Sequence, residues 1–220
     1  MTVDPVHLLA TLATLAAVDP VGARWVADQR TTPGSPQQVR LAFSRAARKL
    51  ADGPIEPGDG LPGHMRGGHW QIVDLGRAAL VLAAVDGDGG TALVEQLFRT
   101  GELGEQASVL RMLALLPAPA RFTAIAIEAC RTNARSVFAA IATRNPFPAA
   151  EFPELAFNQM VLKAVFIGLP VATIVGLAER ATPELRRMAL GYASERSAAG
   201  RSVPDDVAEI VAACERGGEQ

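Results

Sequence analysis

Residues 145–170 have the sequence NPFPAAEFPELAFNQMVLKAVFIGLP, and they are the most informative stretch of the chain. Three prolines, at positions 146, 148 and 153, precede an apolar run that ends at Gly168 and Pro170. Proline is favoured at the first position of a helix, and glycine followed by proline is a typical helix end. The stretch therefore predicts a proline-rich loop that leads into a helix beginning near Pro153.

This predicted helix is apolar on two sides. At 100° per residue, one side holds Phe157, Met160, Val161, Ala164 and Val165. The opposite side holds Leu155, Leu162 and Phe166. A helix that is apolar all round is usually buried, so we expect this one to pack between neighbours on both sides.

The same stretch carries the candidate binding residues, which are Asn145, Glu154, Asn158, Gln159 and Lys163. A buried polar group without a partner costs roughly 1–3 kcal/mol, so these groups are expected to have partners. In one interpretation, Asn158 or Gln159 binds the carbonyls of the loop over residues 145–152 and Asn145 caps its turn. In the other, Glu154, Asn158, Gln159 and Lys163 line a small polar pocket for a ligand.

The rest of the chain also has the spacing of helices. They are predicted over residues 5–18, 20–28, 36–50, 70–85, 91–100, 102–116, 118–130 and 132–143, and again after Pro183 and Pro204. The connections are short, and no run alternates β-branched residues as a strand would. We predict one all-α domain over residues 1–220, built as an irregular α-solenoid of antiparallel helix pairs resembling HEAT repeats. A single globular helical bundle is the alternative.

One long irregular segment interrupts this pattern. Residues 52–69 contain six glycines and three prolines, which predicts a mobile linker or lid. His64 and His69 lie within it, but two histidines without a nearby carboxylate make a poor zinc site. The acidic, glycine-rich run over residues 86–90 resembles the start of a calcium loop. It lacks the remaining ligands, so we expect a tight turn between helices.

Composition excludes several classes of function. A net charge of −2 and a pI near 5.9 argue against nucleic-acid binding. Cys130 and Cys214 belong to no metal or redox motif and are expected to be reduced core thiols. No stretch reads as a signal peptide or a transmembrane span, which predicts a cytoplasmic location. We find no cofactor motif and no group of residues typical of a catalytic or metal site.

A basic helix face is the candidate partner surface. Arg40, Arg45, Arg48 and Lys49 lie opposite the apolar residues of the helix predicted over residues 36–50. This face is either a solvated surface or a docking site for an acidic partner or an anionic membrane surface.

The motif over residues 145–164, NPFPAxxFPELAFNQMVLKA, is similar to the signature segment of the EboA family. Thr182-Pro183-Glu184-Leu185 and the run from Tyr192 to Arg201 resemble the same family's C-terminal helix. The resemblance is close over residues 140–205; the N-terminal half resembles the family only in helical character. It implies a protein of bacterial gene clusters that traffic secondary-metabolite precursors toward the periplasm. It also implies protein partners from the same cluster, one of them a membrane prenyltransferase, and it transfers no catalytic residue.

The resemblance favours a non-enzymatic helical adaptor or carrier, cytoplasmic or peripheral to the inner membrane. Two alternatives stay open. An enzyme would use Glu154 as acid and base and Lys163 as an electrostatic stabiliser, acting on a small metabolite. A membrane-surface or prenyl-chain binding protein would use the basic face and the apolar helix.

Overall fold

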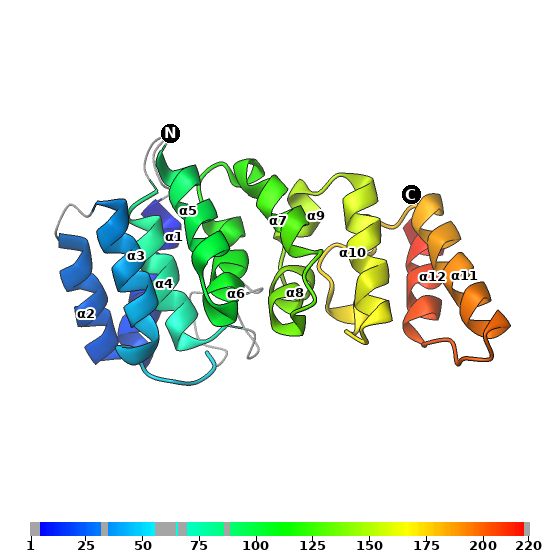
Figure 1. Cartoon of the computed structure of the whole chain (residues 1–220), viewed down its shortest axis with the longest axis horizontal. Helices are drawn as coiled ribbons and strands as arrows, with labels where there is room; N and C mark the ends of the chain where they lie inside the picture. The colour runs from blue at the N-terminus through cyan, green and yellow to red at the C-terminus, as the bar shows by residue number, and fades with distance from the viewer. Residues whose placement is uncertain (1–4, 32–34, 56–64, 66–69, 86–88, 218–220) are drawn as a thin grey trace. The chain divides into compact units, whose positions relative to one another are not determined.

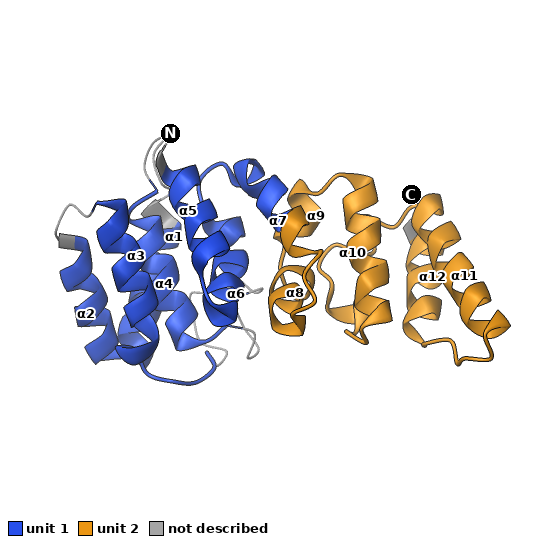
Figure 2. Ribbon diagram, in the orientation of Figure 1, with its two compact units in different colours: residues 1–126 blue, residues 127–220 orange. Residues whose placement is uncertain are grey.

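The computed structural model of the chain describes residues 5–31, 35–55, 65, 70–85 and 89–217. These residues are all-helical, as predicted, and a bridge between Pro54 and Gln71 is the one β-type pairing among them (Figure 1). His64, His69 and residues 86–88 of the turn predicted over residues 86–90 lie outside the described residues. The chain divides into two compact units, Met1–Ala126 and Ile127–Gln220 (Figure 2).

Unit 1 is organised around one buried helix. Its helices are α1 (Pro5–Val18), α2 (Pro20–Thr31), α3 (Pro36–Arg45), α4 (Ile72–Leu82), α5 (Gly89–Thr100) and α6 (Leu103–Met112). Helix α4 contacts α1, α2, α3 and α6. It is buried on nearly every side, as the apolar pattern of this segment predicts.

Side-chain caps fix where the helices of unit 1 begin. Ser35 and Gln38 form a reciprocal capping box at the start of α3, so the helix start predicted at residue 36 is confirmed. Asp19 accepts a hydrogen bond from the Gly22 backbone N–H at 2.9 Å and caps α2. Helix α3 ends at Arg45 and continues as a 3-10 turn over Ala46–Arg48, which is shorter than the helix predicted to residue 50.

A buried polar network joins α4 to α6. Asp74 accepts hydrogen bonds from Ser108 Oγ at 2.5 Å, Arg111 Nη1 at 2.9 Å and the Gln71 backbone N–H at 2.8 Å. Arg77 donates to Ser108 Oγ at 2.9 Å and to the Phe43 carbonyl of α3 at 3.2 Å. This network is not among the features predicted from the sequence.

Unit 2 contains the stretch that the sequence singles out. Helix α7 (Thr123–Ala129) crosses the boundary between the units, and α8 (Arg135–Ala142), α9 (Phe147–Glu151), α10 (Glu154–Phe166), α11 (Pro183–Ala198) and α12 (Asp206–Gly217) follow. The proline-rich loop predicted before α10 contains the short helix α9. Pro153 is the residue before α10 rather than its first residue.

Helix α10 ends as its sequence predicts. Gly168 adopts a positive φ of 68°, which glycine tolerates because it has no Cβ. The Gly168 N–H donates to the Val165 carbonyl and the Leu169 N–H to the Ala164 carbonyl. This pair of bonds is the Schellman motif, and it satisfies carbonyls that the helix end leaves unpaired.

The prediction that Cys130 and Cys214 are core thiols is wrong. Cys214 is half-buried; Ala213 is the buried residue of this turn of α12, together with Val207 and Ile210. Cys130 is also half-buried.

Candidate functional site: an apolar cleft beside α10

The two apolar sides of α10 have different surroundings. Its first side is buried as predicted, since Phe157, Met160, Val161, Ala164 and Val165 are all in the core. The second side is not packed against a neighbour: Leu155 is 60% exposed and Phe166 is 71% exposed. The prediction of a helix packed on both sides is therefore wrong, because unit 2 covers only one side of α10.

A cleft of about 550 Å³ lies along part of this uncovered side. Its lining comes from the connection between α7 and α8, from α8, from the C-terminal half of α10 and from α11. The lining residues are Thr132, Asn133, Arg135, Phe138, Leu162, Lys163, Phe166, Ile167 and Tyr192. The lining thus includes three aromatic and two aliphatic side chains, and Leu155 lies outside it. Phe138 is fully buried, so Phe166 and Tyr192 supply the accessible aromatic surface.

Lys163 is a wall of the cleft, and its ammonium group is already engaged. Nζ donates to the carbonyls of Cys130 at 2.6 Å and Thr132 at 2.7 Å, just beyond the last residue of α7. It also lies 4.9 Å from the centroid of the Phe138 ring. A cation at a helix C-terminus satisfies free carbonyls and interacts favourably with the helix dipole, so Lys163 caps α7.

Arg135 does the same at the end of α10. Its guanidinium donates to the carbonyl of Ile167 and, at 2.9 Å, to the carbonyl of Gly168. Both cations of the cleft are therefore occupied by helix ends. What the cleft offers a ligand is mainly apolar and aromatic surface.

The predicted binding residues do not meet in one pocket. Glu154 is exposed at the start of α10 and accepts a hydrogen bond from Thr182 Oγ1 at 3.0 Å. Gln159 is exposed, and Asn158 is buried. Asn145 is also buried; it donates to the Ala140 carbonyl at 2.9 Å and accepts from the Phe147 N–H at 3.0 Å, so it caps the turn before α9.

Arg180 holds the proline-rich segment before α10, which is the task expected of Asn158 or Gln159. Its guanidinium donates to the Ala149 carbonyl at 2.5 Å and to the Phe152 carbonyl at 2.7 Å. It also lies 4.9 Å from the centroid of the Phe157 ring. The sequence offers no periodic signal for this contact, because Arg180 lies in the irregular segment between α10 and α11.

We predict that Arg180→Met destabilises the protein by roughly 2–3 kcal/mol, because two carbonyls lose a charged donor. Urea unfolding followed by circular dichroism measures the loss. Arg201→Met is the matched control, since Arg201 is exposed, and it should change the free energy of unfolding by less than about 0.5 kcal/mol. Equal effects of the two substitutions would contradict the assigned role of Arg180.

Asn158 is the one buried candidate binding residue whose side chain has no hydrogen-bond partner within the described part of the chain. Its side chain is fully buried, and neither Oδ1 nor Nδ2 makes a hydrogen bond there. A buried amide in this state loses its hydration without compensation. The partners expected for Asn158 are therefore not provided by the loop that the sequence analysis assigned to it.

We predict that Asn158→Leu stabilises the protein by roughly 1–3 kcal/mol, because a side chain of similar size replaces an unpaired buried amide. The free energy of unfolding in urea measures this, with the exposed Gln159→Leu as the control. A loss of stability in Asn158→Leu would show that the amide has a partner in solution, such as a buried water.

We expect the Cys130 thiol, which lies close in sequence to the cleft residues Thr132 and Asn133, to be a weak nucleophile. Burial raises the pKa of Cys130 to about 12, although the nearby Lys163 ammonium acts in the opposite direction. Little thiolate is present at neutral pH, and the thiolate is the nucleophile. Among the described residues, no three His, Cys, Asp or Glu side chains gather as a metal site would require, and no helix there is long and apolar enough to cross a membrane.

A family model described as "Metabolite traffic protein EboA" matches residues 38–212. This range begins within α3, includes α4 to α11 and ends within α12, and it therefore contains both the cleft and the motif over residues 145–164. No curated protein and no solved structure matches the chain.

Proposed function

We propose a function from the premise that the chain belongs to the EboA family of metabolite traffic proteins. The protein is a non-enzymatic carrier or adaptor, and it binds an apolar metabolite precursor in the cleft beside α10, called the α10 cleft below. The observation that carries this proposal is the uncovered side of α10. Phe166 is 71% exposed at the cleft, and Phe138, Leu162 and Tyr192 line it as well.

The physical argument rests on apolar area. Removing apolar surface from water contributes about 25 cal/mol per Å², and a phenylalanine side chain that becomes fully buried contributes roughly 1.5–3 kcal/mol. A ligand that covered Phe166 would release much of this free energy. The volume of about 550 Å³ also falls within the range usual for small-molecule sites.

The hydrogen bonds that Lys163 and Arg135 already make indicate how polar a ligand of the cleft can be. Lys163 and Arg135 each donate to two backbone carbonyls, so a ligand that took either cation as its main partner would compete with a helix cap. An apolar ligand that contacts the aromatic rings does not compete with either helix cap. This favours an apolar body over a strongly charged one.

The enzyme alternative gains no support from the described residues. Glu154 and Lys163 are nine positions apart on α10, which corresponds to roughly 13 Å along a helix. Glu154 is exposed beside Thr182, while Lys163 caps α7. An acid–base pair must reach one substrate, and this spacing does not favour it.

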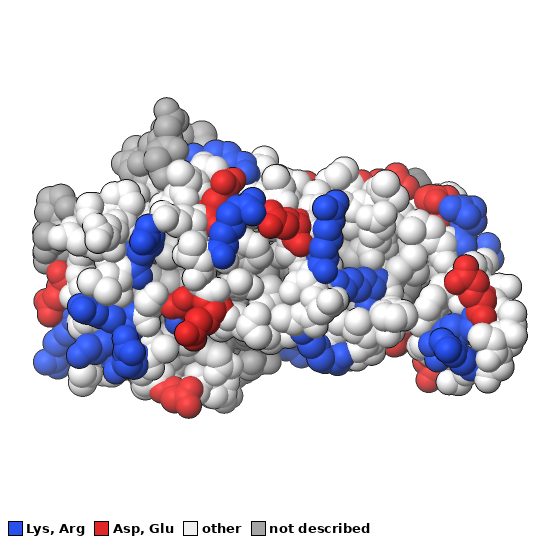
Figure 3. All heavy atoms as spheres, in the orientation of Figure 1, with Lys and Arg blue, Asp and Glu red and all other residues white. Residues whose placement is uncertain are grey.

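The basic face supports a proposal about partners. Arg45, Arg48 and Lys49 are exposed, and Figure 3 shows Lys and Arg side chains gathered over the lower ends of α2 and α3. We include in the proposal an acidic protein partner from the same gene cluster at this face; an anionic membrane surface is its alternative. The irregular solenoid and the single domain over residues 1–220 also stay proposals.

Titration with Nile red, a neutral apolar fluorophore, tests the binding proposal. We expect saturable binding with a blue-shifted emission, because the dye would leave water for the cleft. Emission that rises linearly with protein and never saturates would contradict it. Affinity purification from the native host, with cluster-encoded proteins among the captured ones, tests the partner proposal separately.

A further inference from the structure

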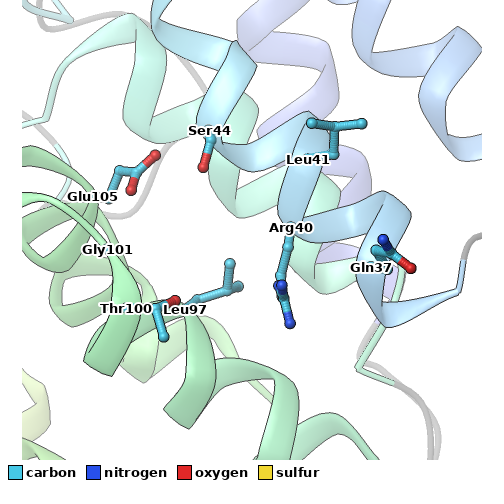
Figure 4. Close-up of a pocket in the computed structure, with 8 residues that line it drawn as sticks. All are labelled: Gln37, Arg40, Leu41, Ser44, Leu97, Thr100, Gly101 and Glu105. Atoms are coloured by element: carbon cyan, nitrogen blue, oxygen red, sulfur yellow. The ribbon is translucent and has the colours of Figure 1, made fainter.

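Unit 1 has a pocket of its own, with a different lining. It lies between α3 on one side and α5 and α6 on the other and has a volume of about 300 Å³. The lining residues are Gln37, Arg40, Leu41, Ser44, Leu97, Thr100, Gly101 and Glu105 (Figure 4). The family description names no role for this pocket, and the proposed carrier function uses the α10 cleft instead.

Arg40 distinguishes this pocket. The side chain is half-buried and extends into the space between α3 and the helix that carries Leu97 and Thr100 (Figure 4). Its guanidinium makes no hydrogen bond or ion pair with any residue that the structure describes. This separates Arg40 from Arg45, Arg48 and Lys49, the other residues of the predicted basic face, because those three are exposed and do not line the pocket.

The charge behind the pocket is already balanced. Glu105 on the opposite wall lies 3.7 Å from Arg77 Nη2 and accepts a hydrogen bond from the Glu102 N–H at 3.0 Å. Behind it, Asp74 pairs with Arg111 at 2.9 Å. Burial lowers the pKa of Arg77, while the Glu105 and Asp74 carboxylates oppose that shift. Two carboxylates thus balance two guanidinium groups, and the positive charge of Arg40 is left without a counter-charge in the pocket.

Two neutral polar side chains lie beside Arg40 on α3. Gln37 precedes it by three positions and Ser44 follows it by four, so all three share one face of the helix. Both residues are exposed, and neither side chain has a hydrogen-bond partner among the described residues. Ser44 and Glu105 point into the same end of the pocket, while Leu97 lies against its middle (Figure 4).

We propose that this pocket binds a small hydroxylated oxyanion, with its anionic group at Arg40. The planar guanidinium matches a carboxylate or a phosphate with two parallel hydrogen bonds. Gln37 and Ser44 hydrogen-bond the hydroxyl groups, and Leu41 and Leu97 contact the carbon skeleton. The site is independent of the α10 cleft and goes beyond the proposed carrier function.

Isothermal titration of the full chain with glycerol phosphate, inorganic phosphate, glycolate and neutral glycerol tests the proposal. We expect one of the anions to bind, while glycerol does not. Comparing the affinities for glycerol phosphate and inorganic phosphate with the affinity for glycolate shows whether the site prefers a phosphate or a carboxylate. Arg40→Ala should weaken binding roughly 10- to 100-fold, because a charged hydrogen-bond pair is lost. Arg45→Ala, on the same helix but outside the pocket, should bind as the wild type does.

Ser44→Leu provides a second variant, which fills the pocket without removing charge. It should also abolish binding, and circular dichroism checks that both variants fold. The proposal is overturned if no anion binds. It is overturned equally if Arg40→Ala and Arg45→Ala weaken binding by the same factor, because the attraction would then be non-specific, or if Ser44→Leu binds as the wild type does.

Discussion

Asp74→Ala is expected to destabilise the protein by roughly 3–5 kcal/mol, the largest effect of any substitution considered. The Asp74 side chain is 1% exposed and accepts three hydrogen bonds, from Ser108, Arg111 and the Gln71 backbone. Arg77 is buried and Arg111 is half-buried. Without Asp74, these two guanidinium groups have only the Glu105 carboxylate to balance their charge. An uncompensated buried charge costs more than the net contribution of an intact pair.

Urea unfolding of three variants separates the contribution of the Asp74 charge from that of its hydrogen bonds. Asp74→Asn keeps the shape and part of the hydrogen bonding while removing the charge, so it should be less destabilised than Asp74→Ala. Asp52→Ala, at an exposed position of the same unit, should stay within about 0.5 kcal/mol of the wild type. If Asp74→Ala also stays within 1 kcal/mol of the wild type, roughly the net contribution of one ordinary hydrogen bond, the network does not stabilise unit 1 as described.

Phe166→Asp is expected to weaken binding in the α10 cleft roughly 30- to 1000-fold, which corresponds to about 2–4 kcal/mol. The substitution removes the most exposed aromatic ring of the cleft and places a charge where an apolar ligand would lie. The stability of the protein should change little, because Phe166 is already 71% exposed. Nile red titration measures the affinity, and urea unfolding checks the fold.

Leu155→Asp is the matched control for this prediction. Leu155 is on the same apolar side of α10 and is 60% exposed, but it does not line the cleft. Its substitution should leave the affinity for Nile red within about twofold of the wild type, since an exposed position away from the contact has little effect. Equal losses in both variants would mean that the dye adsorbs to the apolar side as a whole rather than to the cleft.

The helices and their ends could be predicted from the sequence, because those signals are local. Ser35-Pro36 and Thr182-Pro183 each place a capping side chain before a proline, and both side chains accept a hydrogen bond from the first turn of the helix. Gly168 ends α10 because a positive φ suits glycine. The buried side of α10 follows from the 3.6-residue period alone.

The other side of α10 could not be predicted, because periodicity shows that a side is apolar but not whether a neighbour covers it. Leu155, Leu162 and Phe166 look like core residues in sequence, but in the structure Leu155 and Phe166 are exposed and Leu162 is half-buried. Covering depends on where the chain turns after Gly168, which is a tertiary property. The same information would have been needed to find the cleft.

Long side chains that reach across the fold were missed for a related reason. Lys163 and Arg180 contact carbonyls 28 to 33 positions away in sequence. No spacing rule within one helix reveals such a partner. Asp74 and Arg77 did leave a signal, since two charges three positions apart interrupt a helix that is otherwise apolar on every side.

Mass spectrometry of small molecules extracted from the protein, purified from its native host, tests the central claim most directly. The wild type, Phe166→Asp and Leu155→Asp should be purified in parallel. If the α10 cleft carries an apolar metabolite, one apolar compound will co-purify with the wild type and with Leu155→Asp, and it will be absent from Phe166→Asp. The same compound in equal amount on all three proteins, or no compound on any, would contradict the claim.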